Sequence, residues 1–165
     1  MKVYLASSIF YEKDMMWNKY ICKKIVERFP NIDLYSPILN EEINDKTKSA
    51  GAIQIAEGDL ERLDSTDILI AVLDNDVIPS GTSAEIGYFS RMCIADSNKT
   101  IIGLYTDTRE CSKTFSQEKI ERLHEPGENQ FSYANLFTLG LVKKFGILTL
   151  SSDEMIKKLG EYINE

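Results

Sequence analysis

Apolar residues recur along this chain at two spacings, which together predict alternating strands and helices. Short runs that are apolar throughout are typical of strands buried on both faces. Longer segments that are apolar at every third or fourth position predict helices with one buried face. The predicted strands cover 2–6, 32–37, 67–74, 99–106 and 145–150. The predicted helices cover 11–28, 50–65, 82–95, 134–143 and 152–163, the last of them capped by Ser151 or Ser152.

This alternation of strand and helix predicts an α/β fold. Right-handed crossovers between such elements produce a mainly parallel sheet with helices on both faces. We expect a flavodoxin-like, doubly wound sheet of about five strands, formed by residues 1–165 as a single domain. Ligands bind such sheets beyond the carboxyl ends of the strands, where the strand order reverses. Residues 38–49 are predicted to be a loop, and 107–129 a polar insert that covers the site or forms a subunit contact.

Composition and charge narrow the classes of partner. The formal net charge is −7, and the isoelectric point is near 4.9. Nucleic acid polymers and anionic membranes favour cationic surfaces, so neither is expected as the main partner. No apolar stretch is long enough to predict a membrane span, and no signal peptide is predicted. Cys22, Cys93 and Cys111 are scattered, which favours a reduced cytoplasmic protein over a disulfide framework or a zinc site. Cys22 and Cys93 fall in helical apolar patterns, which predicts that these two thiols are buried.

The segment PSGTSAEIGY, residues 79–88, follows the central predicted strand and contains the first candidate for chemistry. Thr82 and Glu85 fit a capping box, in which the glutamate bonds back to the start of the helix. Glu85, however, lies one turn before Phe89, at the edge of the predicted buried stripe, whereas a purely structural cap faces solvent. A carboxylate kept ionised by a helix N-terminus is the form that a glycosyl-transferring nucleophile needs. The local pattern leaves both interpretations open.

Three aspartates are candidates for a second acid. Asp59 falls beside the apolar face of the helix predicted over 50–65, and a solvated surface acid is the common alternative. Asp74 and Asp76 end the central strand, where they could solvate a loop, hold a metal or act as acids. Two aspartates alone are weak support for Mg²⁺, so no metal site is predicted. The apolar face beside Asp59 consists of Ile53, Ala56, Leu60 and Leu63.

Four short segments, in this order, resemble the nucleoside 2-deoxyribosyltransferase family over nearly the full chain. VYLASSIF resembles the family's opening strand, and GDLERLDSTDILIAVLD its stretch with an aspartate eight residues before the acidic start of the third strand. SGTSAEIGY resembles its nucleophile turn, GxxxE(I/L)G, and NLFTLG its asparagine-containing segment near the C-terminus. Each motif is weakly specific alone, but their order is specific. The resemblance implies transfer of 2-deoxyribose between nucleobases through a covalent glycosyl-enzyme intermediate.

The resemblance also implies a role for each matched residue. Glu85 is the nucleophile that attacks C1′, Tyr4 orients its carboxylate, and Asp59 helps to protonate the leaving base. The implied contacts are Phe10 on the base, Asn40 and Glu41 at base edges, Gly81 in the nucleophile turn, and Asn135 on the sugar hydroxyls from a neighbouring subunit. The ordinary alternatives are a strand aromatic for Tyr4, core for Phe10 and a helix cap for Asn135. No cofactor is expected, and the expected partners are nucleosides, nucleobases and other copies of the chain in a homodimer or larger homo-oligomer.

One position departs from the family pattern. An aspartate usually stands two residues before the glycine of the nucleophile turn, and Pro79 occupies that position here. Asp76 is a candidate substitute and is therefore counted among the substrate contacts, with Asp74 as a second candidate.

Two other functions compete with the transferase. The first is hydrolysis of the N-glycosidic bond of a nucleoside or a nucleoside 5′-monophosphate. Ser7 and Ser8 are a weak phosphate signal for it, with no lysine or arginine nearby. The second is a non-enzymatic, flavodoxin-like nucleoside-binding domain. A receiver domain is not favoured because VYLASS lacks acids, and a dinucleotide fold is not favoured because GxGxxG is missing.

Overall fold

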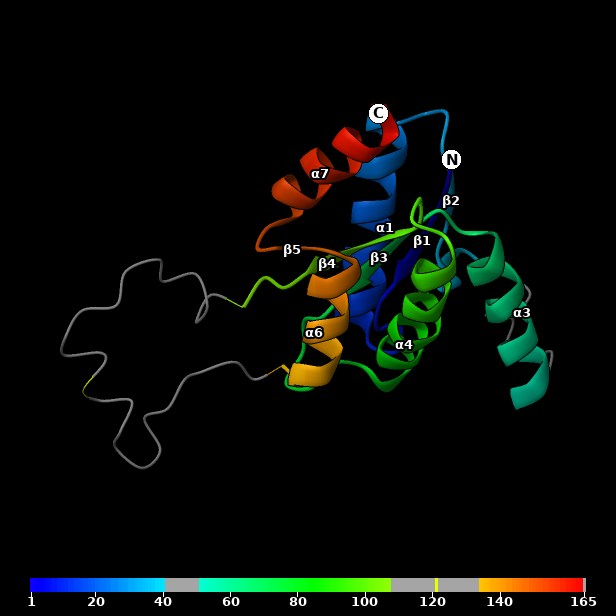
Figure 1. The fold of residues 1–165 in the computed structure, drawn as a ribbon, viewed down its shortest axis with the longest axis vertical. Helices are drawn as coiled ribbons and strands as arrows, with labels where there is room; N and C mark the ends of the chain where they lie inside the picture. Colours follow the sequence, from blue (N-terminus) through cyan, green and yellow to red (C-terminus); the bar gives the residue numbers. More distant parts are fainter. Residues whose placement is uncertain (41–50, 108–120, 122–133, 165) are drawn as a thin grey trace.

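The sheet at the centre of the computed structural model has five strands, all parallel, in the order β2-β1-β3-β4-β5 (Figure 1). The structure describes residues 1–40, 51–107, 121 and 134–164. The strands are β1 Lys2–Ala6, β2 Asp33–Tyr35, β3 Ile68–Val72, β4 Thr100–Leu104 and β5 Gly146–Thr149. The predicted flavodoxin-like order is confirmed. The order reverses between β1 and β3, so a ligand is expected beyond their carboxyl ends.

Helices cover both faces of this sheet. They are α1 Glu12–Arg28, the short 3-10 helix η1 Pro37–Leu39, α3 Ala52–Ser65, α4 Ser80–Ala95, α6 Leu136–Phe145 and α7 Ser152–Asn164. Figure 1 shows α1 and α7 on one face, and α4 and α6 on the other. Successive strand residues point to opposite faces. Tyr4 and Ala6 therefore join the core beneath α4 and α6, whereas Val3 and Leu5 join the core beneath α1 and α7.

Helix α3 is less buried than its sequence predicts. Of the four apolar residues expected on its buried face, only Leu63 is buried, while Ile53 is 75% exposed and Leu60 is 39% exposed. The reason is the placement of the helix. Its C-terminal end meets the sheet, and its other end projects away from the body (Figure 1). The prediction of a continuous buried face is therefore wrong for the described part of the chain.

Three smaller predictions concern the cap of α7, the cysteines and membrane-spanning helices. Ser151 caps α7 as predicted, because its Oγ accepts from the backbone N–H of Glu154 at 3.2 Å. Cys22 and Cys93 are buried free thiols, as predicted, whereas Cys111 and almost all of the 107–129 insert lie outside the described residues. No helix in the described ranges has both the length and the apolar character needed to cross a membrane.

Candidate active site

A tyrosine hydroxyl lies between two carboxylates on the α4 side of the sheet. The Oη of Tyr4, in β1, donates a hydrogen bond to Oε1 of Glu85 at 2.6 Å and lies 3.4 Å from Oδ1 of Asp59. Asp59 belongs to α3 and Glu85 to α4, so three separate elements meet here. One hydroxyl hydrogen cannot serve both acceptors fully, and the shorter distance favours Glu85. Tyr4 is fully buried in a strand, which fixes the position of its hydroxyl.

The start of α4 explains the position of Glu85. The helix begins at Ser80, with Pro79 at the N-cap and no side-chain cap bond, so Glu85 lies in its second turn. The capping-box interpretation is therefore wrong. Thr82 is buried, and its hydroxyl has no hydrogen-bond partner among the residues described. Glu85 does lie one turn before the buried Phe89, at the edge of the core, as predicted.

Burial controls the protonation of both carboxyl groups. Desolvation raises the pKa of Glu85 to about 7, against the lowering effect of the Tyr4 hydrogen bond, and the charge of Asp59 raises it further. Desolvation also raises the pKa of Asp59, while the Tyr4 hydrogen bond lowers it. The prediction that the helix N-terminus keeps Glu85 ionised is wrong, because a second-turn residue is beyond the free N–H groups and burial dominates. The pair can therefore hold one proton near neutral pH.

The proton on Tyr4 itself stays in place. Desolvation and the charge of Glu85 both raise the pKa of Tyr4 well above its ordinary value. Its hydroxyl therefore keeps its proton, and remains a donor, at neutral pH. A permanent donor to Glu85 stabilises the ionised form of that carboxylate without competing for its proton.

Tyr35 is a residue of the site that sequence reasoning missed. It ends β2 in register with Tyr4, and the two ring centroids lie 5.1 Å apart. Nδ2 of Asn40 donates to its hydroxyl at 3.3 Å, and the guanidinium of Arg62 lies over its ring at 5.0 Å. Desolvation raises the pKa of Tyr35, so its hydroxyl also stays protonated. The only sequence signal was a tyrosine within the second predicted strand, since the neighbours of Tyr35 depend on the strand order.

The other predicted substrate contacts differ in exposure. Phe10 is 84% exposed in the connection from β1 to α1, so its interpretation as a core residue is wrong. Asn40 follows η1 and is half-buried against Tyr35. Gly81 is exposed in the first turn of α4, and Asp76 is exposed in the connection from β3 to α4. Glu41 lies outside the described residues. Their roles toward a substrate stay predictions.

Asn135 acts as a helix cap within its own chain. Its Oδ1 accepts from the backbone N–H groups of Phe137 at 3.0 Å and Thr138 at 3.1 Å, at the start of α6. The capping alternative is therefore confirmed. The side chain is also exposed, and a contact with the sugar of a neighbouring subunit stays a prediction.

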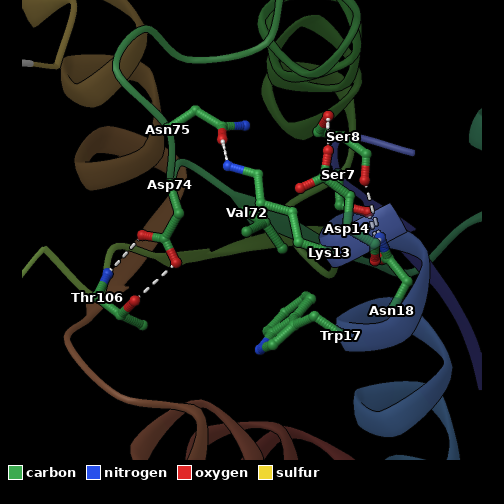
Figure 2. Close-up of a pocket in the computed structure, with 10 residues that line it drawn as sticks. All are labelled: Ser7, Ser8, Lys13, Asp14, Trp17, Asn18, Val72, Asp74, Asn75 and Thr106. Atoms are coloured by element: carbon green, nitrogen blue, oxygen red, sulfur yellow. Dashed lines mark hydrogen bonds between the residues drawn. The ribbon is translucent and has the colours of Figure 1, made fainter. Parts of the chain in front are cut away.

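Asp74, the second candidate substitute for the missing aspartate, is engaged elsewhere. Its Oδ1 accepts from the backbone N–H of Thr106 at 2.6 Å, and its Oδ2 accepts from the hydroxyl of that threonine at 2.8 Å (Figure 2). This pair ties the end of β3 to the end of β4. No three His, Cys, Asp or Glu side chains gather as a metal site in the ranges described.

The family profile of the nucleoside 2-deoxyribosyltransferases matches residues 3–144. The chain belongs to this family. Among solved structures, a conserved protein from Enterococcus faecalis V583 is 34% identical, with a TM-score of 0.87 and 98% of each chain covered. An uncharacterized protein of Ureaplasma parvum serovar 3 is 35% identical over 95 residues, which is 53% of this chain. The chain spans only 58% of the length of that relative.

Two further solved structures share the fold of this chain at lower sequence identity. A 2-desoxiribosyltransferase from Leishmania mexicana is 17% identical with a TM-score of 0.61, and 97% of each chain is covered. A CMP N-glycosidase from Clostridium botulinum is 17% identical with a TM-score of 0.51, covering 98% of this chain and 100% of that one. At 17% identity each, these two likenesses concern the fold alone.

Proposed function

We propose that this protein transfers 2-deoxyribose between nucleobases through a covalent intermediate on Glu85. The observation that supports this most strongly is the 2.6 Å hydrogen bond from the buried Tyr4 to Glu85, with Asp59 beside the same hydroxyl. One oxygen of Glu85 is held by Tyr4, and the other, Oε2, has no hydrogen-bond partner among the described residues. A carboxylate with one fixed and one free oxygen is suited to attack a sugar carbon.

In the first step, Oε2 of Glu85 attacks C1′ of the nucleoside. The bond between C1′ and the base nitrogen breaks, and its electron pair passes to the base. A proton from Asp59 joins the base, which leaves as a neutral molecule. Burial raises the pKa of both carboxyl groups, and the Tyr4 hydrogen bond lowers the pKa of both. The proposed attack requires that the proton shared by this pair lies on Asp59 when Oε2 of Glu85 reacts.

In the second step, the nitrogen of another base attacks C1′ of the intermediate. The ester bond to Glu85 breaks and restores its carboxylate, and the attacking base gives a proton to Asp59. Each displacement inverts C1′, so the two together retain the configuration. Water in place of the second base would make the same intermediate a route to hydrolysis.

The remaining matched residues complete this proposal. The exposed ring of Phe10 packs on the base, Asn40 and Glu41 contact its edges, and Gly81 lets the substrate approach the first turn of α4. Asn135 reaches the sugar hydroxyls from a neighbouring subunit, in a homodimer or larger homo-oligomer. The exposed apolar side chains of α3 support burial against another copy. Each chain acts as one domain.

A product assay tests the proposal. The protein is incubated with deoxyinosine, with and without free adenine, and the products are separated by chromatography. New deoxyadenosine is expected when adenine is present. Release of hypoxanthine without exchange would replace transfer by hydrolysis, and a parallel incubation with deoxyinosine 5′-monophosphate would show whether a phosphate is required. No reaction across a panel of nucleosides would leave a nucleoside-binding domain.

A further inference from the structure

A cavity of about 310 Å³ lies at the carboxyl edge of the sheet, and none of Tyr4, Asp59 and Glu85 lines it. Its walls come from the ends of β1 and β3, the first turns of α1 and the segment after β4. Val72 and Trp17 in these walls belong to the core beneath α1 and α7, on the face opposite to Tyr4. We propose that this cavity binds a free nucleobase, a small neutral ring with carbonyl and N–H groups. The choice of a base rests on the proposed function.

Trp17 provides a flat wall for such a ring. Figure 2 shows its indole on one side of the cavity, and Asp74 with Thr106 on the other. The indole is half-buried and packs against the core beneath α1 and α7, which limits its motion. Planar bases stack favourably on aromatic side chains. A cavity of this volume is at the small end of ligand pockets, which suits a base more than a whole nucleotide.

Lys13 and Asp74 supply complementary polar groups beside this wall. The Nζ of Lys13 makes one hydrogen bond within the described residues, a long one of 3.4 Å to Oδ1 of Asn75, and keeps further N–H groups for a carbonyl oxygen. Each oxygen of Asp74 accepts one bond from Thr106 and has a lone pair left for an N–H of the ligand. The carbonyl and N–H groups of a base match this donor and this acceptor.

The charges around the cavity argue against an anion. Lys13 does lie in the same cavity as Ser7 and Ser8, which corrects the view that no lysine is near these serines. The carboxylates of Asp14 and Asp74 line the cavity with it, and they would repel a phosphate. The serine hydroxyls also point away from such a ligand, because Ser7 donates to Asn18 and Ser8 donates to Asp14, each at 2.5 Å.

Hydrogen bonds within the chain hold the walls of the cavity. Asn18 is 1% exposed, and its Nδ2 donates to the backbone oxygens of Ser8 and Asp14 at 2.8 Å each. Asn75 adopts φ 147°, a strained conformation for a residue other than glycine, and strain of this kind clusters at functional sites. Asp14 and Asn18 thus place a satisfied polar network on the buried face of α1, where apolar residues would otherwise pack. A role in shaping the binding cavity explains why polar residues occupy these two buried positions.

Trp17 is the only tryptophan of the 165 residues, so its fluorescence reports on this cavity directly. Hypoxanthine and cytosine are titrated separately into the wild-type protein and into Glu85→Gln. Saturable quenching of Trp17 is expected in both. Lys13→Met should raise the Kd from this titration at least tenfold. Lys23→Met, which removes a lysine of the same helix with a 75% exposed side chain, should bind like wild type.

Three results would overturn the site. The first is no saturable quenching with either base. The second is an equal Kd in Lys13→Met and Lys23→Met, which would place the bound base elsewhere. The third is equal quenching by inorganic phosphate or by L-leucine, which would assign the cavity to another class of ligand. Quenching without any transfer would refute the proposed function alone, and transfer without quenching would refute this site alone.

Discussion

The hydroxyl of Tyr4 lies 2.6 Å from a carboxylate oxygen of Glu85, although the two residues are 81 positions apart in the sequence. The parallel sheet brings them together, since β1 pairs with β3 and α4 follows β3 onto the face where Tyr4 points. The contact fixes one oxygen of the proposed nucleophile and removes it from water. It therefore connects the strand order of the fold to the protonation of Glu85.

Tyr4→Phe removes this hydrogen bond and keeps the ring. Loss of one preorganised donor is expected to lower kcat on the order of a hundredfold. The bond also favours the ionised carboxylate, so its loss should raise the pKa of Glu85 and move the acidic limb of the kcat/KM profile to higher pH. Tyr88→Phe is the matched control. Tyr88 lies in α4, the helix that carries Glu85, and donates a 2.6 Å hydrogen bond to Asp64 at the exposed surface. Identical profiles in the two variants would contradict the role of Tyr4.

The raised pKa of Glu85 also predicts how stability depends on pH. Because its folded pKa of about 7 exceeds the ordinary value of 4.5, the folded state binds this proton more tightly than the unfolded state. The contribution to the free energy of unfolding is complete below the ordinary pKa and is lost as pH rises through the folded pKa. Over that window the loss is about 3 kcal/mol. Denaturant unfolding of wild type and Glu85→Gln across the window measures it.

Glu85→Gln cannot ionise and should therefore lose less stability than wild type as the pH rises. Glu27→Gln, which removes an exposed carboxylate on α1, should follow the wild-type curve. If wild type and Glu85→Gln showed the same pH dependence, burial would not be controlling this carboxyl group.

The sequence predicted the sheet and the three central residues, but not the environment of those residues. Alternating strands and helices predicted the parallel sheet, and the family resemblance selected Tyr4, Asp59 and Glu85, whose side chains the structure brings together. The pattern did not locate the start of α4, because Ser80 and Gly81 are poor helix formers that enter the helix behind the fixed φ of Pro79. The protonation of Glu85 depends on contacts across the sheet, which no local pattern contains.

The cavity beside Trp17 could not be predicted from the sequence either. Its lining comes from segments that only the packing of α1 against the ends of β3 and β4 brings together. The sequence separates Lys13 from Asn75 by 62 positions, and no motif connects them. Tyr35 was missed for the same reason, since its place beside Tyr4 follows from strand register.

Pro79 offers a test that separates capping from catalysis. It occupies the N-cap of α4 without a side-chain cap bond, so Pro79→Ser and Pro79→Asp should each stabilise the protein by about 1 kcal/mol. Only Pro79→Asp restores the acid usual in the family, and only it should raise the rate of transfer on common deoxynucleosides. Thermal unfolding and initial rates measure the two effects. Equal rates in both variants would show that the missing acid does not limit the reaction.

Asn135 has a cap role in the structure and a proposed role in a neighbouring subunit. Asn135→Ala removes the cap of α6 and should cost about 1 kcal/mol of stability. Asn135→Ser keeps a capping oxygen but loses the amide, so it should retain stability while raising KM if the amide reaches a sugar hydroxyl. Sedimentation of both variants under assay conditions gives the oligomeric state. A fully active monomer, or an Asn135→Ser variant with unchanged KM, would exclude the contact between subunits.

The covalent intermediate on Glu85 is the central claim, and trapping it is the most direct measurement. A 2-fluorinated arabinosyl nucleoside slows the second displacement, so the protein should gain the mass of one fluorinated sugar. Fragmentation after proteolysis should place that mass on Glu85, and Glu85→Ala should show neither the adduct nor turnover. An adduct on another residue, or turnover by Glu85→Ala, would contradict the account.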